Sequence, residues 1–221
     1  MPRRSVSRFK GHTAGANPAA FPGFITPCDP TLREQAPGGA GWLHEIKIDG
    51  YRAQLHIQGG KIRVYSRSGY DWTEQFHQIA QAARALASHD LIIDGEASVL
   101  GNTGLPDFQQ LRRELAKKHS DRLIYHAFDL LYLDGYDLRR APLIERKAAL
   151  RDVIPKRTKT IAFTEFFEKQ DGDAVYRHAC KLGLEGIVSK LRDSPYRSGR
   201  QESWIKLKCT KSDTFPIIAF V

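Results

Sequence analysis

The stretch from residue 44 to residue 52, HEIKIDGYR, constrains the fold most, because it alternates apolar and polar side chains and then turns. Alternation predicts a β-strand with one buried face, and the Asp-Gly pair predicts a tight turn at its end. On such a strand Glu45 and Lys47 share one face, whereas Ile46 and Ile48 face the other way, into a core. A lysine held beside a carboxylate is either a nucleophile or a solvated surface charge, and this stretch alone leaves both readings open.

Length and charge narrow the class of protein. The chain has 221 residues, which suffices for one large domain or for one domain and a fragment. Its 34 Lys and Arg residues exceed its 25 Asp and Glu residues, which gives a net charge of +9. This surplus indicates either a polyanionic partner, nucleic acid being the commonest, or general solubility. No apolar run reaches the length of a membrane span, so we predict no membrane partner.

The three cysteines are scattered, without a Cys-x-x-Cys pair or a Cys/His metal spacing. We therefore predict neither a zinc site nor a disulfide framework, which suits a reducing, intracellular compartment. Residues 1–28 contain no acid and carry four Lys and Arg residues among serines. This composition fits an organellar transit peptide or a basic flexible arm, and we predict an arm over residues 1–20.

The rest of the chain mixes strands and helices. Strands are predicted at 42–48, 51–57, 62–67, 91–100, 123–133, 161–167, 186–190 and 204–208. Helices are predicted at 75–88, 107–118, 143–153 and 171–182, with Asp107 and Asp171 as N-caps. Residues 11–37 lack periodicity and are predicted to be irregular. Hairpins interspersed with helices favour an α+β fold with largely antiparallel sheets and flanking helices.

Further short motifs follow the first stretch in order. They are SRSG at 66–69, DGE at 94–96, FDLLYLDG at 128–135, LEGIVSK at 184–190 and SWIKLK at 203–208. Taken singly, each has an ordinary reading: a surface arginine, a solvent-facing glutamate, a core phenylalanine. In SWIKLK, a period of two puts Lys206 and Lys208 on one face and Ile205 and Leu207 in a core. No G-x-x-x-x-G-K-[ST] or G-x-G-x-x-G motif occurs, so a P-loop or Rossmann site is not predicted.

Together with these motifs, KIDGYR at 47–52 resembles the covalent nucleotidyltransferases: ATP-dependent DNA ligases, RNA ligases and mRNA capping enzymes. In that superfamily a lysine attacks the α-phosphate of a nucleotide and holds the nucleoside monophosphate through a P–N bond. Three segments are most similar in sequence to the ligase domain of bacterial non-homologous end-joining enzymes. They are WLHEIKIDGYR at 42–52, DWT at 71–73 and PYRSG at 195–199. The resemblance implies a nucleotidyltransferase (DNA ligase adenylation) fold over residues 21–210.

The resemblance also implies a role for each motif residue. Lys47 would be the catalytic nucleophile, and Glu185 would be a ligand of Mg²⁺ or Mn²⁺. ATP would be the cofactor, with its purine stacked on Phe128 and its ribose contacted by Glu96. The full set of implied nucleotide-binding residues is Glu45, Ile46, Arg52, Arg67, Glu96, Phe128, Lys206 and Lys208.

Partners and alternatives follow from the same resemblance. It implies duplex DNA with nicks or ends as substrate, a Ku-type end-binding protein as partner, and a bacterial, cytoplasmic, nucleoid-associated location. Family ligases continue into an oligonucleotide-binding domain with a sixth motif, and residues 211–221 look like its first strand, which puts full nick sealing in doubt.

The alternatives are an RNA ligase or capping-type guanylyltransferase, and a non-catalytic DNA-end-binding module. Labelling with ATP or GTP would separate the two enzymes.

Overall fold

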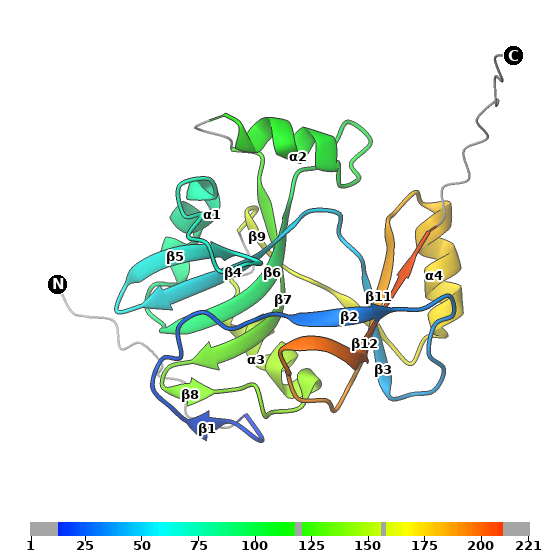
Figure 1. Cartoon of the computed structure of the whole chain (residues 1–221), viewed down its shortest axis with the longest axis horizontal. Coiled ribbons are helices and arrows are strands. Elements are labelled where there is room, and N and C mark those ends of the chain that lie inside the picture. The colour runs from blue at the N-terminus through cyan, green and yellow to red at the C-terminus, as the bar shows by residue number, and fades with distance from the viewer. Residues whose placement is uncertain (1–12, 118–120, 156–157, 210–221) are drawn as a thin grey trace, which may run out of the picture.

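Two β-sheets form the centre of the computed structural model, which describes residues 13–117, 121–155 and 158–209 (Figure 1). Within these residues sheet A has seven strands, with β9 (Ile161–Phe163) paired to β7 and the others in the spatial order β1 (Asn17–Pro18), β8 (Tyr136–Asp137), β7 (Ile124–Leu133), β6 (Leu91–Ser98), β4 (Tyr51–Gln58) and β5 (Lys61–Ser66). Sheet B has five strands, in the order β10 (Phe166–Glu168), β3 (Trp42–Ile46), β11 (Gly186–Leu191), β12 (Gly199–Lys208) and β2 (Cys28–Leu32).

Most neighbouring strands are antiparallel. Among the described strands, only β12 with β2 and β7 with β9 run parallel. The predicted α+β fold with largely antiparallel sheets is therefore confirmed.

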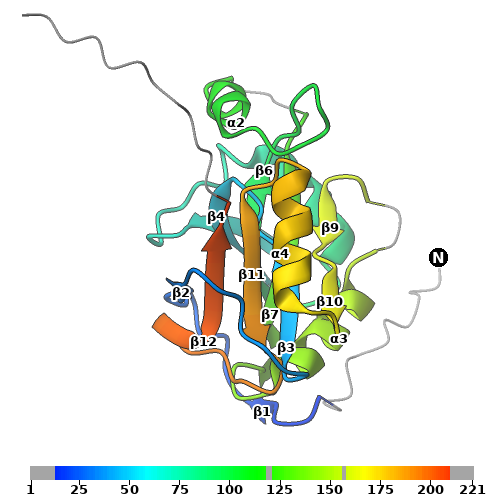
Figure 2. The same ribbon diagram turned by 90° about the vertical axis from the view of Figure 1, so that its right-hand side faces the viewer.

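Helices α1 (His77–Ala82), α3 (Leu143–Val153) and α4 (Gly172–Lys181) pack against the sheets. The first of them continues as a 3-10 turn over Ala83–Leu86, and a further helix is α2 (Phe108–Leu115). Ile79 of α1 and Leu150 of α3 join the buried core of sheet A. Figure 2 shows α4 lying over sheet B, alongside β11, and Ala179 packs with Ile187 and Leu207 in one buried cluster. Burial of these apolar faces, more than helix propensity, stabilises such short helices. No helix in the described ranges is long and apolar enough to cross a membrane.

Two predicted helix caps are confirmed. The Asp107 side chain accepts a hydrogen bond from the Gln110 backbone N–H at 2.9 Å, and the Asp171 side chain accepts one from the Asp173 N–H at 3.3 Å. Each carboxylate satisfies a backbone donor that the first helical turn leaves unpaired.

Two predictions of secondary structure are wrong. Residues 161–167, predicted as one strand, form β9 in sheet A and β10 in sheet B, so the chain crosses between the sheets at Thr164 and Glu165. Residues 11–37, predicted to be irregular, contain β1 and β2. Pro30 interrupts the pattern of β2, but this strand lies at the edge of sheet B, where a missing N–H is tolerated. Residues 1–12 of the predicted arm and residues 210–221 lie outside the described residues.

The prediction that no disulfide forms is also wrong. Cys180, in the last turn of α4, is bonded to Cys209, which directly follows β12, and their Cα atoms are 5.4 Å apart. Only the packing of α4 on sheet B brings these residues together across 29 positions of sequence. Cys28 is a free, buried thiol.

Two glycines allow close approach of neighbouring strands, one in each sheet, where the site will form. A Cβ added to Gly50 would lie 2.2 Å from the Ala97 carbonyl oxygen, and one added to Gly186 would lie 1.9 Å from the Leu207 carbonyl oxygen. Any side chain there would push the backbones apart. These glycines let the residue before β4 approach β6, and the start of β11 approach the end of β12.

Candidate active site

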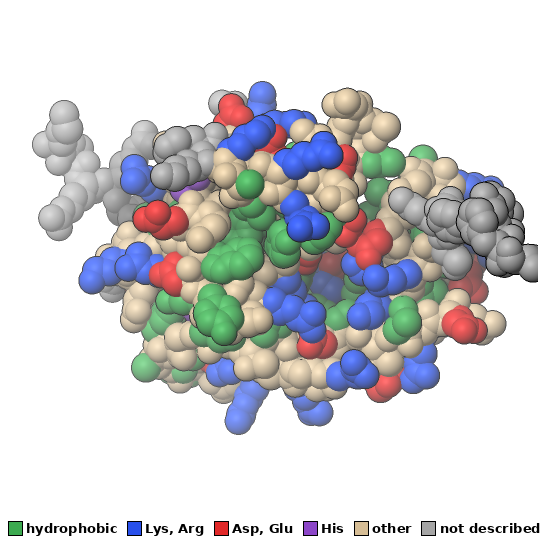
Figure 3. Space-filling view, turned by 45° about the horizontal axis from the view of Figure 1, so that its top comes forward, with side chains coloured by type: hydrophobic (Ala, Val, Ile, Leu, Met, Phe, Trp, Pro, Cys, Tyr) green, Lys and Arg blue, Asp and Glu red, His purple; other side chains and the backbone are tan. Residues whose placement is uncertain are grey.

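A cavity of about 560 Å³ opens between the two sheets. Every sheet B strand except β10 contributes to its walls, together with β4, β5, β6 and β7 of sheet A. Figure 3 shows a hollowed centre in this face of the molecule, where Lys and Arg side chains gather. The cavity is lined by nearly all the site residues that the sequence predicts: Glu45, Ile46, Lys47, Arg52, Arg67, Glu96, Phe128 and Lys206.

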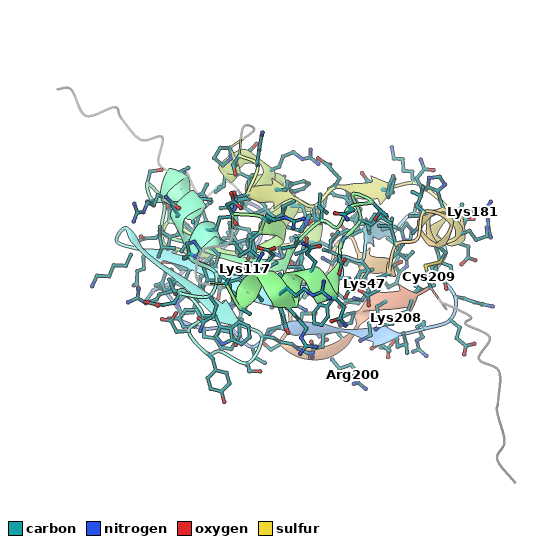
Figure 4. All side chains as sticks on the ribbon, turned by 90° about the horizontal axis from the view of Figure 1, so that it is seen from above. Lys47, Lys117, Lys181, Arg200, Lys208 and Cys209 are labelled. Atoms are coloured by element: carbon teal, nitrogen blue, oxygen red, sulfur yellow. A yellow bond between two sulfur atoms is a disulfide. The ribbon has the colours of Figure 1, made fainter. Side chains whose placement is uncertain are left out.

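Lys47 lies directly after β3, at the boundary of this cavity with a smaller one. Its backbone N–H donates to the Gly186 carbonyl at 2.9 Å, which fixes the start of the turn. Its ammonium group forms an ion pair and a hydrogen bond with Glu185 Oε2, and Lys208 Nζ lies 3.2 Å from the other oxygen of Glu185. Figure 4 shows Lys47 and Lys208 beside each other near the end of β12. The predicted nucleophile and the predicted metal ligand are therefore in direct contact.

The smaller cavity, of about 270 Å³, lies on the other side of Lys47. Its polar lining includes Asp49, Glu185 and Lys208. No group of three or more His, Cys, Asp or Glu side chains in the described ranges is arranged to hold a metal ion. Mg²⁺ binds through one or two carboxylates and keeps several waters, so Glu185 fits a water-rich site of this kind.

Lys206 and Lys208 follow the predicted alternation. Ile205 and Leu207 are buried in the core between sheet B and α4, whereas Lys206 lines the larger cavity and Lys208 the smaller. Burial, together with the nearby cations Lys208 and Lys47, lowers the pKa of Lys206. The two lysines thus flank the position of Lys47 from two sides, which suits a phosphate group there.

Arg52 is held in place by three hydrogen bonds. Its Nε and Nη2 donate to the two Asp94 oxygens at 3.0 and 2.6 Å, and its Nη1 donates to the Cys28 carbonyl at 2.8 Å. Burial acts to lower the pKa of Arg52, but the buried Asp94 carboxylate outweighs it, and the pKa is raised. Arg67 instead lies on the exposed rim, paired with Asp29 at 2.8 Å. Both arginines line the cavity, but Arg52 is a fixed part of its wall.

Glu96 and Phe128 come from sheet A and face sheet B. Burial raises the pKa of the Glu96 carboxyl to about 8, although the cations Arg52 and Lys47 act in the opposite direction. A protonated carboxyl can donate as well as accept, which suits contacts with ribose hydroxyls. Phe128 is partly buried, with Lys190 Nζ 4.2 Å from its ring centroid and Arg52 Cζ 5.1 Å from it. Its ring both packs on the core between the sheets and lines the cavity.

Glu45 differs most from its sequence-based interpretation. Glu45 was expected to bind nucleotide beside Lys47, but its side chain is buried and forms ion pairs with Lys147 at 2.7 Å and Lys190 at 2.8 Å. Ile46, expected in a core, packs against the sheet B core but also reaches the cavity. Lys190 belongs to the LEGIVSK motif, so the sequence contained a signal for it, whereas nothing around Lys147 marked that residue.

Comparison with known proteins gives a consistent family. The family described as "ATP dependent DNA ligase domain" matches residues 30–208. The chain is 37% identical over 211 residues to the multifunctional non-homologous end joining protein LigD of Pseudomonas aeruginosa, which covers 96% of this chain and 25% of that protein. It is 38% identical over 170 residues to LigD of Mycobacterium tuberculosis, covering 76% of this chain and 21% of that protein. The chain thus spans a quarter or less of the length of these relatives.

Solved structures agree. The crystal structure of the ligase domain from M. tuberculosis LigD matches with a TM-score of 0.74 and 34% identity, over 83% of this chain and 60% of that chain. A mycobacterial DNA ligase D complexed with ATP and MES matches with the same TM-score at 33% identity, again over 83% of this chain and 60% of that chain. The predicted resemblance to ligase domains of bacterial end-joining enzymes is confirmed, and the alternatives gain no support. The chain belongs to the family of ATP-dependent DNA ligase domains.

Proposed function

We propose that this chain is the adenylation domain of a DNA ligase, and that Lys47 carries the AMP group. The supporting observation is the position of Lys47, between two cavities and among Glu185, Lys206 and Lys208. We propose domain boundaries of 21–210 for this unit, with residues 1–20 as a basic arm and residues 211–221 as the start of an oligonucleotide-binding domain.

In the first step the Lys47 amine attacks the α-phosphorus of ATP. A P–N bond forms, the bond from the α-phosphorus to the bridging oxygen breaks, and pyrophosphate leaves with that electron pair. Lys47 must first lose a proton, and its hydrogen bond to Glu185 provides an acceptor next to the ammonium group. Lys206 and Lys208 offset the negative charge that develops on the phosphate oxygens.

In the next two steps AMP moves to DNA and is then released. An oxygen of the DNA 5′-phosphate attacks the adenylate, which restores the Lys47 amine. The 3′-hydroxyl then attacks the activated 5′-phosphate, a phosphodiester forms, and AMP leaves. We propose Glu185 as the residue that would hold Mg²⁺ or Mn²⁺, which would supply positive charge beside the phosphates. Arg67, on the exposed rim, is placed to contact a DNA phosphate.

The wider setting is proposed from the relatives. LigD proteins are described as multifunctional non-homologous end-joining proteins, so we propose nicked or broken duplex DNA as substrate and a Ku-type protein as partner. A nucleoid-associated location would follow from DNA repair in a bacterial cytoplasm.

Covalent labelling tests the proposal. We expect incubation with α-labelled ATP to add one AMP to the chain and peptide mapping to locate it on Lys47. Lys47→Arg keeps the positive charge but offers no usable amine, so labelling should vanish. Lys181→Arg, on the outer helix α4, is the matched control and should label like the wild type. An acid-labile adenylate that persists in Lys47→Arg would contradict the proposal. Efficient labelling by GTP would favour a capping-type enzyme.

A further inference from the structure

The disulfide between Cys180 and Cys209 closes a ring around Glu185. Cys180 lies in the last turn of α4, and residues 181–184 lead from it to Glu185, directly before β11. The Glu185 carbonyl accepts a hydrogen bond from the Cys209 N–H at 2.9 Å, and Cys209 is bonded back to Cys180. The short segment that carries Glu185 is therefore tied at both ends, to α4 and to the residue that follows β12.

Hydrogen bonds also join α4 to the end of β12 and to the loop before β11. Tyr176 lies one helical turn before Cys180, and its hydroxyl donates to the Lys208 carbonyl at 3.0 Å. After the helix, the Leu184 N–H donates to the Ala179 carbonyl at 3.0 Å. Each of these bonds competes with hydrogen bonds to water, so its net contribution is small. Opening the disulfide therefore leaves the segment tied mainly by weak contacts.

Glu185 is the residue whose position this ring controls. Its carboxylate forms an ion pair with the Lys47 ammonium group, and Lys208 Nζ lies 3.2 Å from its other oxygen. These three residues and Cys209 line the smaller cavity. Figure 4 shows Lys47, Lys208 and Cys209 close together near the end of β12. The disulfide thus borders the cavity in which the proton acceptor of Lys47 lies.

Both cysteines of this disulfide are accessible to small reagents. Cys180 and Cys209 are each partly exposed, whereas the free thiol of Cys28 is buried. Thiol–disulfide exchange requires a thiolate that reaches one sulfur of the bond, so exposed disulfides open and close more readily than buried ones. The bond between α4 and the end of β12 is therefore placed to respond to the thiols and disulfides around the protein, and Cys28 is shielded from them.

We propose that Cys180 and Cys209 form a redox-controlled modification site that sets the rate at which Lys47 is adenylylated; this inference rests on the proposed function. In the oxidised chain the closed ring holds Glu185 against Lys47, so the acceptor for the Lys47 proton is in place before ATP binds. In the reduced chain Glu185 samples other positions, and the reaction slows because a fixed geometry is lost. The chain therefore takes up AMP fastest in an oxidising environment.

The reagent in this exchange is a low-molecular-weight disulfide or thiol, such as glutathione. During oxidation the thiolate of one cysteine attacks a sulfur of the small disulfide, a mixed disulfide forms, and one small thiolate leaves. The thiolate of the other cysteine then attacks the protein sulfur of the mixed disulfide, the bond between Cys180 and Cys209 forms, and the second small thiolate leaves. The two protons of the protein thiols end on the released thiols, and two electrons pass to the small disulfide. Reduction by the small thiol is the reverse sequence.

The test compares the full chain after equilibration with oxidised or reduced glutathione, in the absence of oxygen. Labelling of Lys47 by α-labelled ATP should be about tenfold slower for the reduced chain. Cys180→Ser should label at the slow rate in both states. Cys28→Ala keeps both cysteines of the ring and is the matched control, so its two states should differ by the same factor as those of wild type. Mass spectrometry after alkylation counts the free thiols in each preparation.

Hydrogen exchange in the chain without nucleotide separates positioning from stability. Reduction should speed exchange over residues 182–188 more than over β6, whose buried amides report global unfolding. A bond that only stabilises the fold would not single out residues 182–188 and would leave the labelling rate unchanged well below the unfolding temperature, which would overturn the inference. Equal labelling rates in both redox states would overturn it too and leave the proposed function intact. No labelling in either state would refute the proposed function and, with it, this control of Lys47.

Discussion

At the scale of single residues, charge compensation shapes the site. Glu185 lies between two lysines, Glu45 between two others, and Asp94 against Arg52. Each carboxylate is paired, so the burial of charge is offset, and the side chains are held before any ligand binds. Glu96 forms no ion pair within the described part of the chain, and burial therefore dominates its pKa.

Phe128→Leu tests stacking at the residue scale. The change keeps apolar bulk and removes the aromatic face, so ATP binding should weaken by about 1–3 kcal/mol while the thermal midpoint moves by only a few degrees. Calorimetric binding and thermal unfolding measure the two quantities. Phe167→Leu, at an exposed position of β10, is the matched control and should change neither. A large loss of stability that accounts for the loss of binding would instead assign Phe128 to the core.

Glu96 predicts a pH dependence of stability. Its folded-state pKa of about 8 lies above the unfolded value of 4.5, so its contribution to stability is complete below about pH 4.5 and is lost as the pH rises through 8. We compare the free energy of unfolding of wild type with that of Glu96→Gln at each pH. This difference should decrease by at least about 1 kcal/mol from pH 5 to pH 8.5. Denaturant unfolding at each pH measures it. Glu34→Gln, at an exposed glutamate, should track wild type, and a flat difference for Glu96→Gln would contradict the prediction.

At the scale of elements, the connection between β9 and β10 joins the two sheets, and the disulfide joins α4 to the end of β12. The first places Thr164 in the cavity wall. The second places Cys209 beside Glu185, whose carbonyl accepts from the Cys209 N–H at 2.9 Å. Thr164 and Cys209, which line the two cavities, both lie outside the motifs found in the sequence.

The disulfide predicts a redox-dependent stability. Cys180→Ser should lower the free energy of unfolding by about 2–4 kcal/mol, because the loop that the bond closes becomes free in the unfolded state. Thermal unfolding of wild type with and without a thiol reductant should show the same decrease. The variant that carries both Cys180→Ser and Cys209→Ser is the control, since a reductant should not change its thermal midpoint. A wild-type midpoint that ignores the reductant would show that the bond does not form in solution.

At the scale of the whole molecule, residues of both sheets line the cavity. Figure 3 shows Lys and Arg side chains gathered around the hollow in this face. The net charge of +9 and this gathering of Lys and Arg favour contact with the phosphates of duplex DNA. The apolar contacts between the sheets, around Trp204 and Tyr196, form the floor beneath it.

Salt dependence tests this surface. The affinity for nicked duplex DNA should fall steeply between 50 and 200 mM salt, with a log–log slope of about −0.9 for each phosphate contacted. Duplexes of unrelated sequence should give the same slope, because phosphates carry no sequence information. Fluorescence anisotropy measures both. An affinity that does not respond to salt would rule out binding through phosphates.

The sequence by itself determined the family, the α+β class, the helix caps and the motif residues, because local alternation, capping chemistry and ordered motifs are readable without a partner strand. Alternation in SWIKLK correctly placed Ile205 and Leu207 in the core and Lys206 in the cavity. Only the tertiary structure decided that Glu45 is buried beside Lys147 and that Thr164 lines the cavity. It also decided that residues 161–167 divide between two sheets and that Cys180 pairs with Cys209. The reason is physical: period two tells which side chains share a face, but which residues cover that face depends on contacts distant in sequence.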